Sequence, residues 1–261
     1  MKYGFIGCGN MGGALARAVA KSTEELLLTD RSGRARLLAQ ELGCEYGNNE
    51  QVACQCDRIF LGVKPHMMAE VLRPLQGILK QRKPLLISMA AGLELSKLES
   101  FAGCELPIIR IMPNTPVAVG AGVVLYCCND YVDARTLADL LEDLAPAGLV
   151  DELEERLMDA GSALSGCGPA YLYMMIEAMA DGAVACGIPR GKALEYAAAT
   201  MEGAGRMALE TGLHPGQLKD AVCSPGGSTI AGVKALEQHG FRGAVMDALT
   251  AAHRRNQELG K

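Results

Sequence analysis

The chain has 261 residues, of which 49% are hydrophobic and 21% charged, enough for one large domain or two modest ones with buried cores. This apolar content excludes an intrinsically disordered chain. A formal net charge of -5 gives no electrostatic basis for binding nucleic acid or an anionic membrane, so neither is expected as a partner.

The first 160 residues alternate short strand-like runs with helix-length patterns. Strands are predicted at Tyr3–Gly7, Leu26–Asp30, Arg58–Val63, Leu85–Met89, Ile108–Met112 and Val123–Tyr126, and helices at Met11–Lys21, Arg34–Gly43, His66–Leu79 and Glu94–Phe101. This alternation is typical of an α/β fold, and it predicts an N-terminal Rossmann-like domain with a doubly wound, mostly parallel sheet.

The pattern changes after a Gly/Ser-rich joint at 161–169. Beyond it only helices are predicted, at Pro169–Cys186, Arg190–Thr211, Pro215–Val222, Thr229–His239 and Arg242–Glu258. Residues 1–160 are therefore expected to form the α/β domain and residues 161–261 an all-α domain. The run 168–188 approaches membrane-spanning length, but Glu177 and Asp181 disfavour insertion. An almost uniformly apolar helix is predicted to be buried, for example between subunits.

Ten cysteines are scattered along the chain, and no two of them stand in a CxxC spacing. The four histidines do not complete a zinc site either, so no metal is expected. The start, MKYGFIGCG, is typical of a strand and turn rather than of a signal peptide. These features predict a protein of the reducing cytoplasm whose thiols are mostly small core residues.

A glycine-rich turn follows the first predicted strand. Gly7, Gly9 and Gly12 form a G-x-G-x-x-G that opens directly into an alanine-rich helix. The first glycine allows the tight turn, the second lets a pyrophosphate reach the backbone, and the third permits close packing of helix on strand. Free N–H groups at the helix start then bind the phosphates, so a dinucleotide site is predicted.

The residues after the second strand leave the choice of dinucleotide open. Asp30 stands where an acid hydrogen-bonds the ribose 2'-OH of NAD and repels a 2'-phosphate. Arg31, Ser32 and Arg34 follow at once and are suited to bind the extra phosphate of NADP. Both cofactors therefore remain candidates.

Other turns follow the carboxyl ends of strands, where ligands bind in open α/β sheets. They are Lys64-Pro65, the small residues Ala90-Ala91-Gly92, and the rigid loop 113–116, which presents the amide of Asn114. Each turn alone is more often structural than functional. Their shared position at one edge of the sheet favours a ligand site.

The strongest local signal in the helical half is CSPGGSTI, from Cys223 to Ile230. Two adjacent glycines and two hydroxyl residues at a helix start can serve as an N-cap. They can equally present several backbone N–H groups and a hydroxyl donor to a carboxylate. No G-x-S-x-G elbow, H-E-x-x-H or Walker loop occurs, which disfavours hydrolase and NTPase functions.

Seven segments, spread over essentially the whole chain, resemble the pyrroline-5-carboxylate reductase family. They are GFIGCGNMG, FLGVKP, ISMAAG, RIMPNTP, SGCGPAY, HPGQLKDAVCSPGGSTIAG and GFRGAVMDA. The resemblance implies reduction of 1-pyrroline-5-carboxylate to L-proline, the final step of proline biosynthesis, by NADPH, with NADH as an alternative. It also implies that the helical domain binds substrate and forms a homodimer, often within a larger ring.

The resemblance also implies site residues. Backbone amides of Gly226, Gly227, Ser228 and Thr229 would bind the substrate carboxylate, and the Thr229 hydroxyl would be catalytic by hydrogen-bonding the ring nitrogen. The cofactor would be bound by Gly7, Gly9, Asn10, Met11, Gly12, Arg31, Ser32, Asn49, Val63, Lys64, Pro65, Ala90, Ala91 and Asn114. The chain departs from the family at Cys167, where Ser is usual, and at Asp30, where many members have Asn.

Two other functions are weighed against this one. Another reductase of the β-hydroxyacid dehydrogenase or imine reductase type usually has a catalytic Lys in the first helix of its second domain, and 169–186 contains none. A cofactor-sensing binding protein would keep the Gly7–Gly12 turn but would not need SPGGST.

Overall fold

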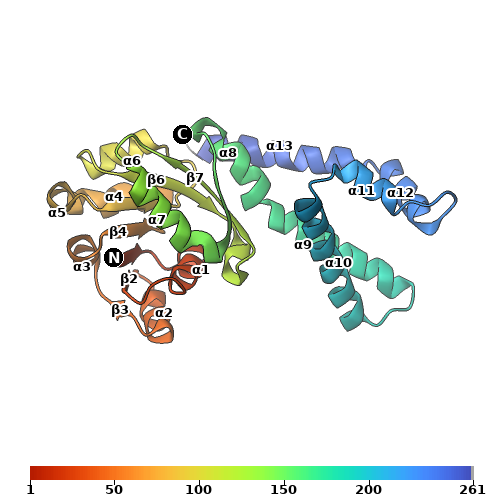
Figure 1. Cartoon of the computed structure of the whole chain (residues 1–261), viewed down its shortest axis with the longest axis horizontal. Helices are drawn as coiled ribbons and strands as arrows, with labels where there is room; N and C mark the ends of the chain where they lie inside the picture. The colour runs from red at the N-terminus through yellow and green to blue at the C-terminus, as the bar shows by residue number, and fades with distance from the viewer. Residues whose placement is uncertain (260–261) are drawn as a thin grey trace. The chain divides into compact units, whose positions relative to one another are not determined.

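In the computed structural model, which describes residues 1–259, the chain divides into an α/β unit and a helical unit (Figure 1). The first comprises Met1–Cys167 together with the C-terminal residues from Ala252, and the second comprises Gly168–Ala251. The predicted boundary between a cofactor-binding domain at residues 1–160 and a substrate-binding, dimerising domain at residues 161–261 stays a prediction.

The first unit is built on a single sheet with the strand order β3-β2-β1-β4-β5-β6-β7-β8. The strands are β1 (Tyr3–Ile6), β2 (Leu26–Thr29), β3 (Glu45–Tyr46), β4 (Arg58–Leu61), β5 (Leu85–Ser88), β6 (Ile108–Pro113), β7 (Gly122–Cys128) and β8 (Gly148–Glu152). Neighbouring strands are parallel except for β6 and β7, which are antiparallel. The predicted doubly wound, mostly parallel sheet is confirmed.

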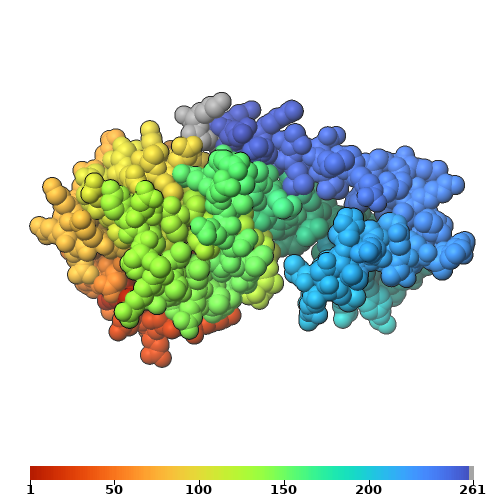
Figure 2. Space-filling view, turned by 45° about the horizontal axis from the view of Figure 1, so that its top comes forward, coloured from red at the N-terminus to blue at the C-terminus, as the bar shows by residue number. Residues whose placement is uncertain are grey.

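Helices cover both faces of this sheet, because successive strand residues such as Phe5 and Ile6 point to opposite sides and enter two different hydrophobic clusters. One face is covered by α1 (Asn10–Val19), α2 (Arg34–Leu42) and α7 (Ala134–Leu144), and Figure 2 shows the green surface around α7. The other face is covered by α3 (Asn49–Gln55), α4 (Met68–Leu72), α5 (Gln76–Arg82) and α6 (Leu95–Ala102).

Two arginines lie fully inside this core. Arg58 at the start of β4 pairs with Asp143 (2.9 Å) and Asp139 (3.4 Å) of α7 and also donates a hydrogen bond to the Tyr3 hydroxyl. Arg110 of β6 pairs with Glu155 (3.4 Å) and Asp159 (3.3 Å). Each buried guanidinium is therefore compensated by two carboxylates, as burial of a charge requires.

The structure differs from the expected elements at several places. The helix predicted at 66–79 is instead two short helices, α4 and α5, joined by a 3-10 turn at Arg73–Leu75. Pro74 lies in that turn, and a proline lacks the N–H group that a continuous helix needs. The strands β3 and β8 and the helices α3 and α7 were not predicted.

In the described part of the region beyond residue 161, every element of secondary structure is a helix, as predicted. The Gly/Ser-rich joint is itself helical: α8 (Met158–Gly161) continues through a π-helical turn (Ser162–Gly166) into α9 (Gly168–Ala185). The remaining helices are α10 (Arg190–Thr211), α11 (Pro215–Ala221), α12 (Ser228–Gln238) and α13 (Phe241–Leu259). Over residues 1–259 no helix is both long and apolar enough to cross a membrane.

Within the single chain α9 is not buried, so its burial against a second subunit stays a prediction. Only Ala180 of this helix is fully buried, against Ala193 and Ala197 of α10. Leu172, Tyr173 and Met174 are each more than half exposed. An apolar helix with so much exposed side chain needs a further surface to cover it.

Candidate functional site

The glycine-rich turn lies where the carboxyl ends of β2, β1 and β4 meet. The N–H of Gly7 donates to the carbonyl of Thr29 (2.8 Å), and the N–H of Gly62 donates to the carbonyl of Ile6 (2.8 Å). Gly7 has a φ of +98°, and a Cβ there would lie 2.6 Å from the carbonyl oxygen of Gly62. A Cβ on Gly12 would overlap the carbonyl oxygen of Gly7. Only glycine fits these positions, as the sequence pattern predicts.

The turn leads into α1, whose N-cap is Gly9. No side chain caps this helix end, so the N–H groups of its first turn are available to a ligand. A Cβ built on Gly9 meets no protein atom within 4 Å, because this glycine borders open space. The helix start therefore has the free donors and the positive dipole end that a phosphate needs.

Two cavities that share part of their lining adjoin this turn. The larger cavity, of about 810 Å³, runs from the carboxyl end of β2 to the start of α3. The smaller cavity, of about 430 Å³, lies between α1 and the end of β5. Both are lined by Gly9, Gly62, Val63 and Lys64. Two cavities that share the phosphate-binding turn fit the two halves of a dinucleotide.

Nearly all of the predicted cofactor residues line these cavities. Gly7, Gly9, Arg31, Ser32, Asn49, Val63 and Lys64 line the larger one. Gly9, Asn10, Met11, Gly12, Val63, Lys64, Pro65, Ala90 and Ala91 line the smaller one. The fold thus brings together five segments that are separated by up to 84 positions in the sequence, from Gly7 to Ala91.

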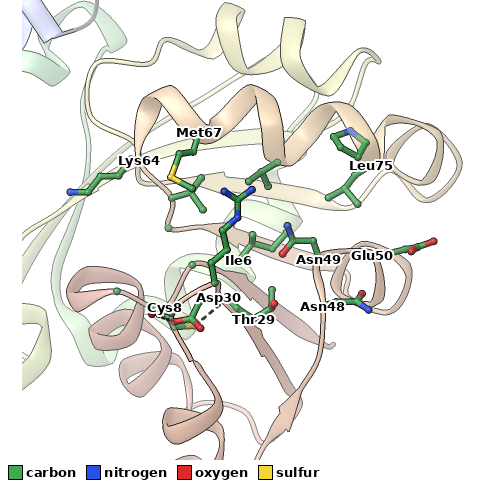
Figure 3. A pocket seen from close by; sticks show the side chains of 18 residues that line it. Ile6, Cys8, Thr29, Asp30, Asn48, Asn49, Glu50, Lys64, Met67 and Leu75 are labelled. Carbon is green, nitrogen blue, oxygen red and sulfur yellow. Dashed lines mark hydrogen bonds between the residues drawn. The ribbon is translucent and has the colours of Figure 1, made fainter. Parts of the chain in front are cut away.

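The larger cavity holds the residues expected to read the adenosine ribose (Figure 3). Both oxygens of Asp30 accept hydrogen bonds within their own turn, from the Ser32 hydroxyl (2.8 Å) and from the N–H of Gly33 (2.9 Å). Arg31 extends from the same turn to Glu70 of α4, with 2.7 Å between nitrogen and oxygen. The turn therefore presents an acid and a cation side by side.

Asn49 is positioned by the start of α3. The preceding residue, Asn48, forms a capping box with Gln51, in which each side chain bonds the other residue's backbone N–H (2.8 and 2.9 Å). Figure 3 shows the Asn49 side chain inside the cavity, between the strand ends and the α4 side. The cap was not foreseen, although N-x-x-Q before a short apolar run is its usual signal.

Asn114 is the one predicted cofactor residue that lines neither cavity. Its amide nitrogen donates to the carbonyl of Ser165 in the π-helical turn (3.0 Å), and its amide oxygen accepts from the N–H of Val123 (2.9 Å). With both ends engaged, this buried side chain joins the end of β6 to β7 and to the π-helical turn.

Cys8, the second residue of the turn, also lines the larger cavity. Its Sγ lies 3.8 Å from the carbonyl oxygen of Thr29. Burial, with nearby Asp30 as a smaller cause, raises the pKa of this thiol to about 12. Cys8 is therefore neutral at physiological pH and adds no negative charge beside a bound phosphate.

The predicted substrate-binding residues lie in the second unit, at the start of α12. Gly226 has a φ of +68°, and the N–H of Gly227 donates to the carbonyl of Ser224 (3.0 Å). No side chain caps α12, so the first-turn N–H groups at Ser228 and Thr229 are available. Both residues are exposed. Among residues 1–259 there is no cluster of three or more His, Cys, Asp or Glu side chains suited to a metal ion.

The fold and this site define a two-unit, Rossmann-type oxidoreductase. Residues 2–92 match the family described as NADP oxidoreductase, coenzyme F420-dependent, and residues 155–259 match the family described as pyrroline-5-carboxylate reductase dimerisation. Pyrroline-5-carboxylate reductase of Escherichia coli is 40% identical over 100% of this chain and 98% of its own length.

Two solved structures cover 100% of the chain at 34% identity, and the chain covers 98% of each. They are the pyrroline-5-carboxylate reductase of Coxiella burnetii, with a TM-score of 0.91, and the pyrroline carboxylate reductase of Plasmodium falciparum with NADP bound, with a TM-score of 0.88. The chain belongs to the pyrroline-5-carboxylate reductase family, as its motifs predicted, and it is an NAD(P)-dependent oxidoreductase with the family's dimerisation domain.

Proposed function

We propose that this protein reduces 1-pyrroline-5-carboxylate to L-proline with NADPH, and with NADH as the alternative donor, in the final step of proline biosynthesis. The observation that carries the proposal is the presence in one chain of two features suited to a cofactor and a substrate. One is the pair of cavities around the Gly7–Gly12 turn, and the other is the uncapped, glycine-preceded start of α12. A dinucleotide sensor would need only the first.

Each part of the cofactor has chain residues suited to it. The first turn of α1 would bind the pyrophosphate through its backbone N–H groups. Arg31, Ser32 and Asn49 would contact the adenosine side, and Val63, Lys64, Pro65, Ala90 and Ala91 the nicotinamide side. When bound, the reduced cofactor supplies the hydride. The small side chains of Ala90 and Ala91 leave room for a flat ring against the backbone.

The start of α12 would bind the substrate. Backbone N–H groups of Gly226–Thr229 would bind its carboxylate, because several amides at a positive helix end suit an anion. The Thr229 hydroxyl would donate a hydrogen bond to the imine nitrogen, which orients the ring and stabilises the amine as it forms. The protein would thus bind and orient the substrate, and it would supply one hydrogen-bond donor, the Thr229 hydroxyl, to the imine nitrogen.

We further propose that two chains pair through their helical units, with dimers arranged in a ring, in the cytoplasm. The exposed apolar side chains of α9 support pairing. Ten free cysteines, several of them buried, support a reducing compartment.

The direct test mixes purified protein and 1-pyrroline-5-carboxylate with NADPH, then with NADH, and follows loss of the reduced nicotinamide absorbance. Substrate-dependent oxidation is expected with at least one donor. Thr229→Ala should lower kcat/KM about 10- to 1,000-fold without changing the Kd of NADPH, and Thr229→Ser should restore most activity. Unchanged kcat/KM in Thr229→Ala would remove the catalytic role of its hydroxyl.

A complementation assay tests whether the two sites of one catalytic centre come from different chains. Thr229→Ala is co-expressed with Gly9→Ala, a variant expected to be defective in cofactor binding but not in folding, and the hybrid is purified by two affinity tags. If each centre uses the turn of one chain and the α12 start of the other, one centre per hybrid is intact and activity returns. If both sites come from the same chain, every centre carries one defect and the hybrid stays inactive.

A further inference from the structure

An ion pair links the two sides of the larger cavity at its rim. Arg31 lines the cavity from the turn after β2, and its guanidinium lies 2.7 Å from the carboxylate of Glu70, on α4 at the other side. The two residues are 39 positions apart, and their side chains are 64% and 63% exposed. The contact is thus a tertiary one, made over the place where the adenosine ribose is expected.

The other polar groups of this turn are engaged in a different way. Ser32 donates to Asp30, and Asp30 accepts from both Ser32 and Gly33, so these bonds stay within the turn. Among Asp30, Arg31 and Ser32, Arg31 has its partner on another element. Arg34, at the start of α2, donates to the side-chain oxygen of Asn10 in α1 (3.3 Å), so its partner is not a carboxylate. A ligand phosphate that binds Arg31 must therefore compete with Glu70, whereas a ribose hydroxyl that binds Asp30 need not.

We propose that Glu70 is a specificity-determining residue that holds Arg31 and so lowers the affinity for the 2'-phosphorylated dinucleotide relative to the unphosphorylated one. Two effects act in the same direction. The 2'-phosphate has to displace the Glu70 carboxylate from the Arg31 guanidinium. The negative charge of Glu70 also repels the phosphate directly. The role of Glu70 rests on the proposed binding of a dinucleotide in this cavity. It adds Glu70, which lies outside the glycine-rich turn, to the residues that determine cofactor binding.

The expected size of the effect follows from the exposure of the pair. Breaking a solvent-exposed ion pair of this kind typically changes an equilibrium constant by roughly 2- to 5-fold. Glu70→Gln keeps the shape and removes the charge. It should tighten NADPH binding by roughly 2- to 5-fold and leave the Kd of NADH unchanged.

The control variant is Glu50→Gln. Glu50 also lines the cavity and is exposed, but it has no ion-pair partner among residues 1–259. If only the net charge of the cavity matters, both variants should favour NADPH alike. If the hold on Arg31 matters, Glu50→Gln should shift the NADPH-to-NADH ratio of Kd values much less than Glu70→Gln does.

The test measures Kd for NADPH and NADH by calorimetry, without imine substrate, on the full-length protein. Wild type, the two glutamate variants, Arg31→Ala and the double variant Arg31→Ala/Glu70→Gln are compared. Glu70→Gln should have a much smaller effect once Arg31 is absent, because only the direct repulsion between Glu70 and the phosphate then remains. The inference is overturned if Glu70→Gln changes both affinities equally, changes neither, or acts equally in the Arg31→Ala background. Failure of the wild type to bind either dinucleotide would overturn the proposed function as well, so the two failures are distinguishable.

Discussion

Gly9 and Gly12 differ in what surrounds them, and the same substitution should therefore have different effects at the two positions. A Cβ on Gly12 would overlap the Gly7 carbonyl oxygen, which is backbone and cannot rotate away. A Cβ on Gly9 meets nothing within 4 Å and would point into the space that both cavities share. Gly12→Ala should damage the fold, whereas Gly9→Ala should damage only ligand binding.

The magnitudes follow from these contacts. Overpacking at Gly12 costs about 1–3 kcal/mol and also displaces the helix start, so the free energy of unfolding and NADPH affinity should fall together. At Gly9 the backbone is extended, with φ −66°, so alanine should change stability by less than about 1 kcal/mol. Loss of one backbone hydrogen bond to a charged phosphate corresponds to about 1.5–3 kcal/mol, or roughly a 10- to 150-fold rise in the Kd of NADPH.

Urea unfolding and NADPH calorimetry on the same preparations separate the two effects. Gly77→Ala is a matched control, because Gly77 lies in α5, away from the cavities, and a Cβ there meets nothing within 4 Å. This variant should bind NADPH normally and gain up to about 1 kcal/mol of helix propensity. The reasoning would be refuted by a Gly9→Ala protein that binds NADPH as tightly as wild type, or by one that loses stability as Gly12→Ala does.

Three further outcomes are expected. Asp143→Asn should lower the free energy of unfolding in urea by about 2–4 kcal/mol because it weakens the compensation of buried Arg58, whereas Glu142→Gln next to it should be nearly neutral. Burial raises the pKa of the Cys127 thiol to about 12, so under reducing conditions this thiol ionises in the unfolded chain at lower pH than in the folded one. The free energy of unfolding should therefore fall as the pH rises above about 9. Cys127→Ala should reduce that loss by about 1.4 kcal/mol per pH unit, and an unchanged slope would contradict this. Asn114→Ala should lower stability by about 2 kcal/mol but change the Kd of NADPH less than about 3-fold; a large loss of NADPH affinity with normal stability would instead support a cofactor contact.

Much of the cofactor side could be predicted because its residues stand in short, contiguous turns. The pattern Gly7-x-Gly9-x-x-Gly12 describes the space around each residue. The structure shows close approaches of a Cβ to backbone atoms at Gly7 and Gly12, and open space at Gly9. The approach of Gly62 to Gly7 joins two strands 55 residues apart, and no local pattern reveals it. The Arg31–Glu70 pair escapes prediction for the same reason.

The elements that were missed are short or exposed. β3 has two residues, both exposed, and β8 has no fully buried residue, so neither carries the apolar run that predicts a strand. α7 could have been found, because Asp133 caps it and Leu140 and Leu144 lie on its buried face. Arg58 and Arg110 contradict the simple expectation that charge marks the surface.

The helical unit shows what a hydrophobic pattern alone can and cannot predict about the packing of a helix. Because α9 is almost uniformly apolar, its sequence pattern indicates that its side chains must pack against another surface. The pattern does not indicate which surface this is. Within the described chain, α9 packs on α10 through a small cluster of Ala180, Ala193 and Ala197, with Ile176, Ala183 and Val184 partly buried against it. This contact leaves Leu172, Tyr173 and Met174 of the same helix more than half exposed. The unmet requirement therefore supports a second copy of the chain as part of the folded unit, which is consistent with the dimerisation family matched over residues 155–259.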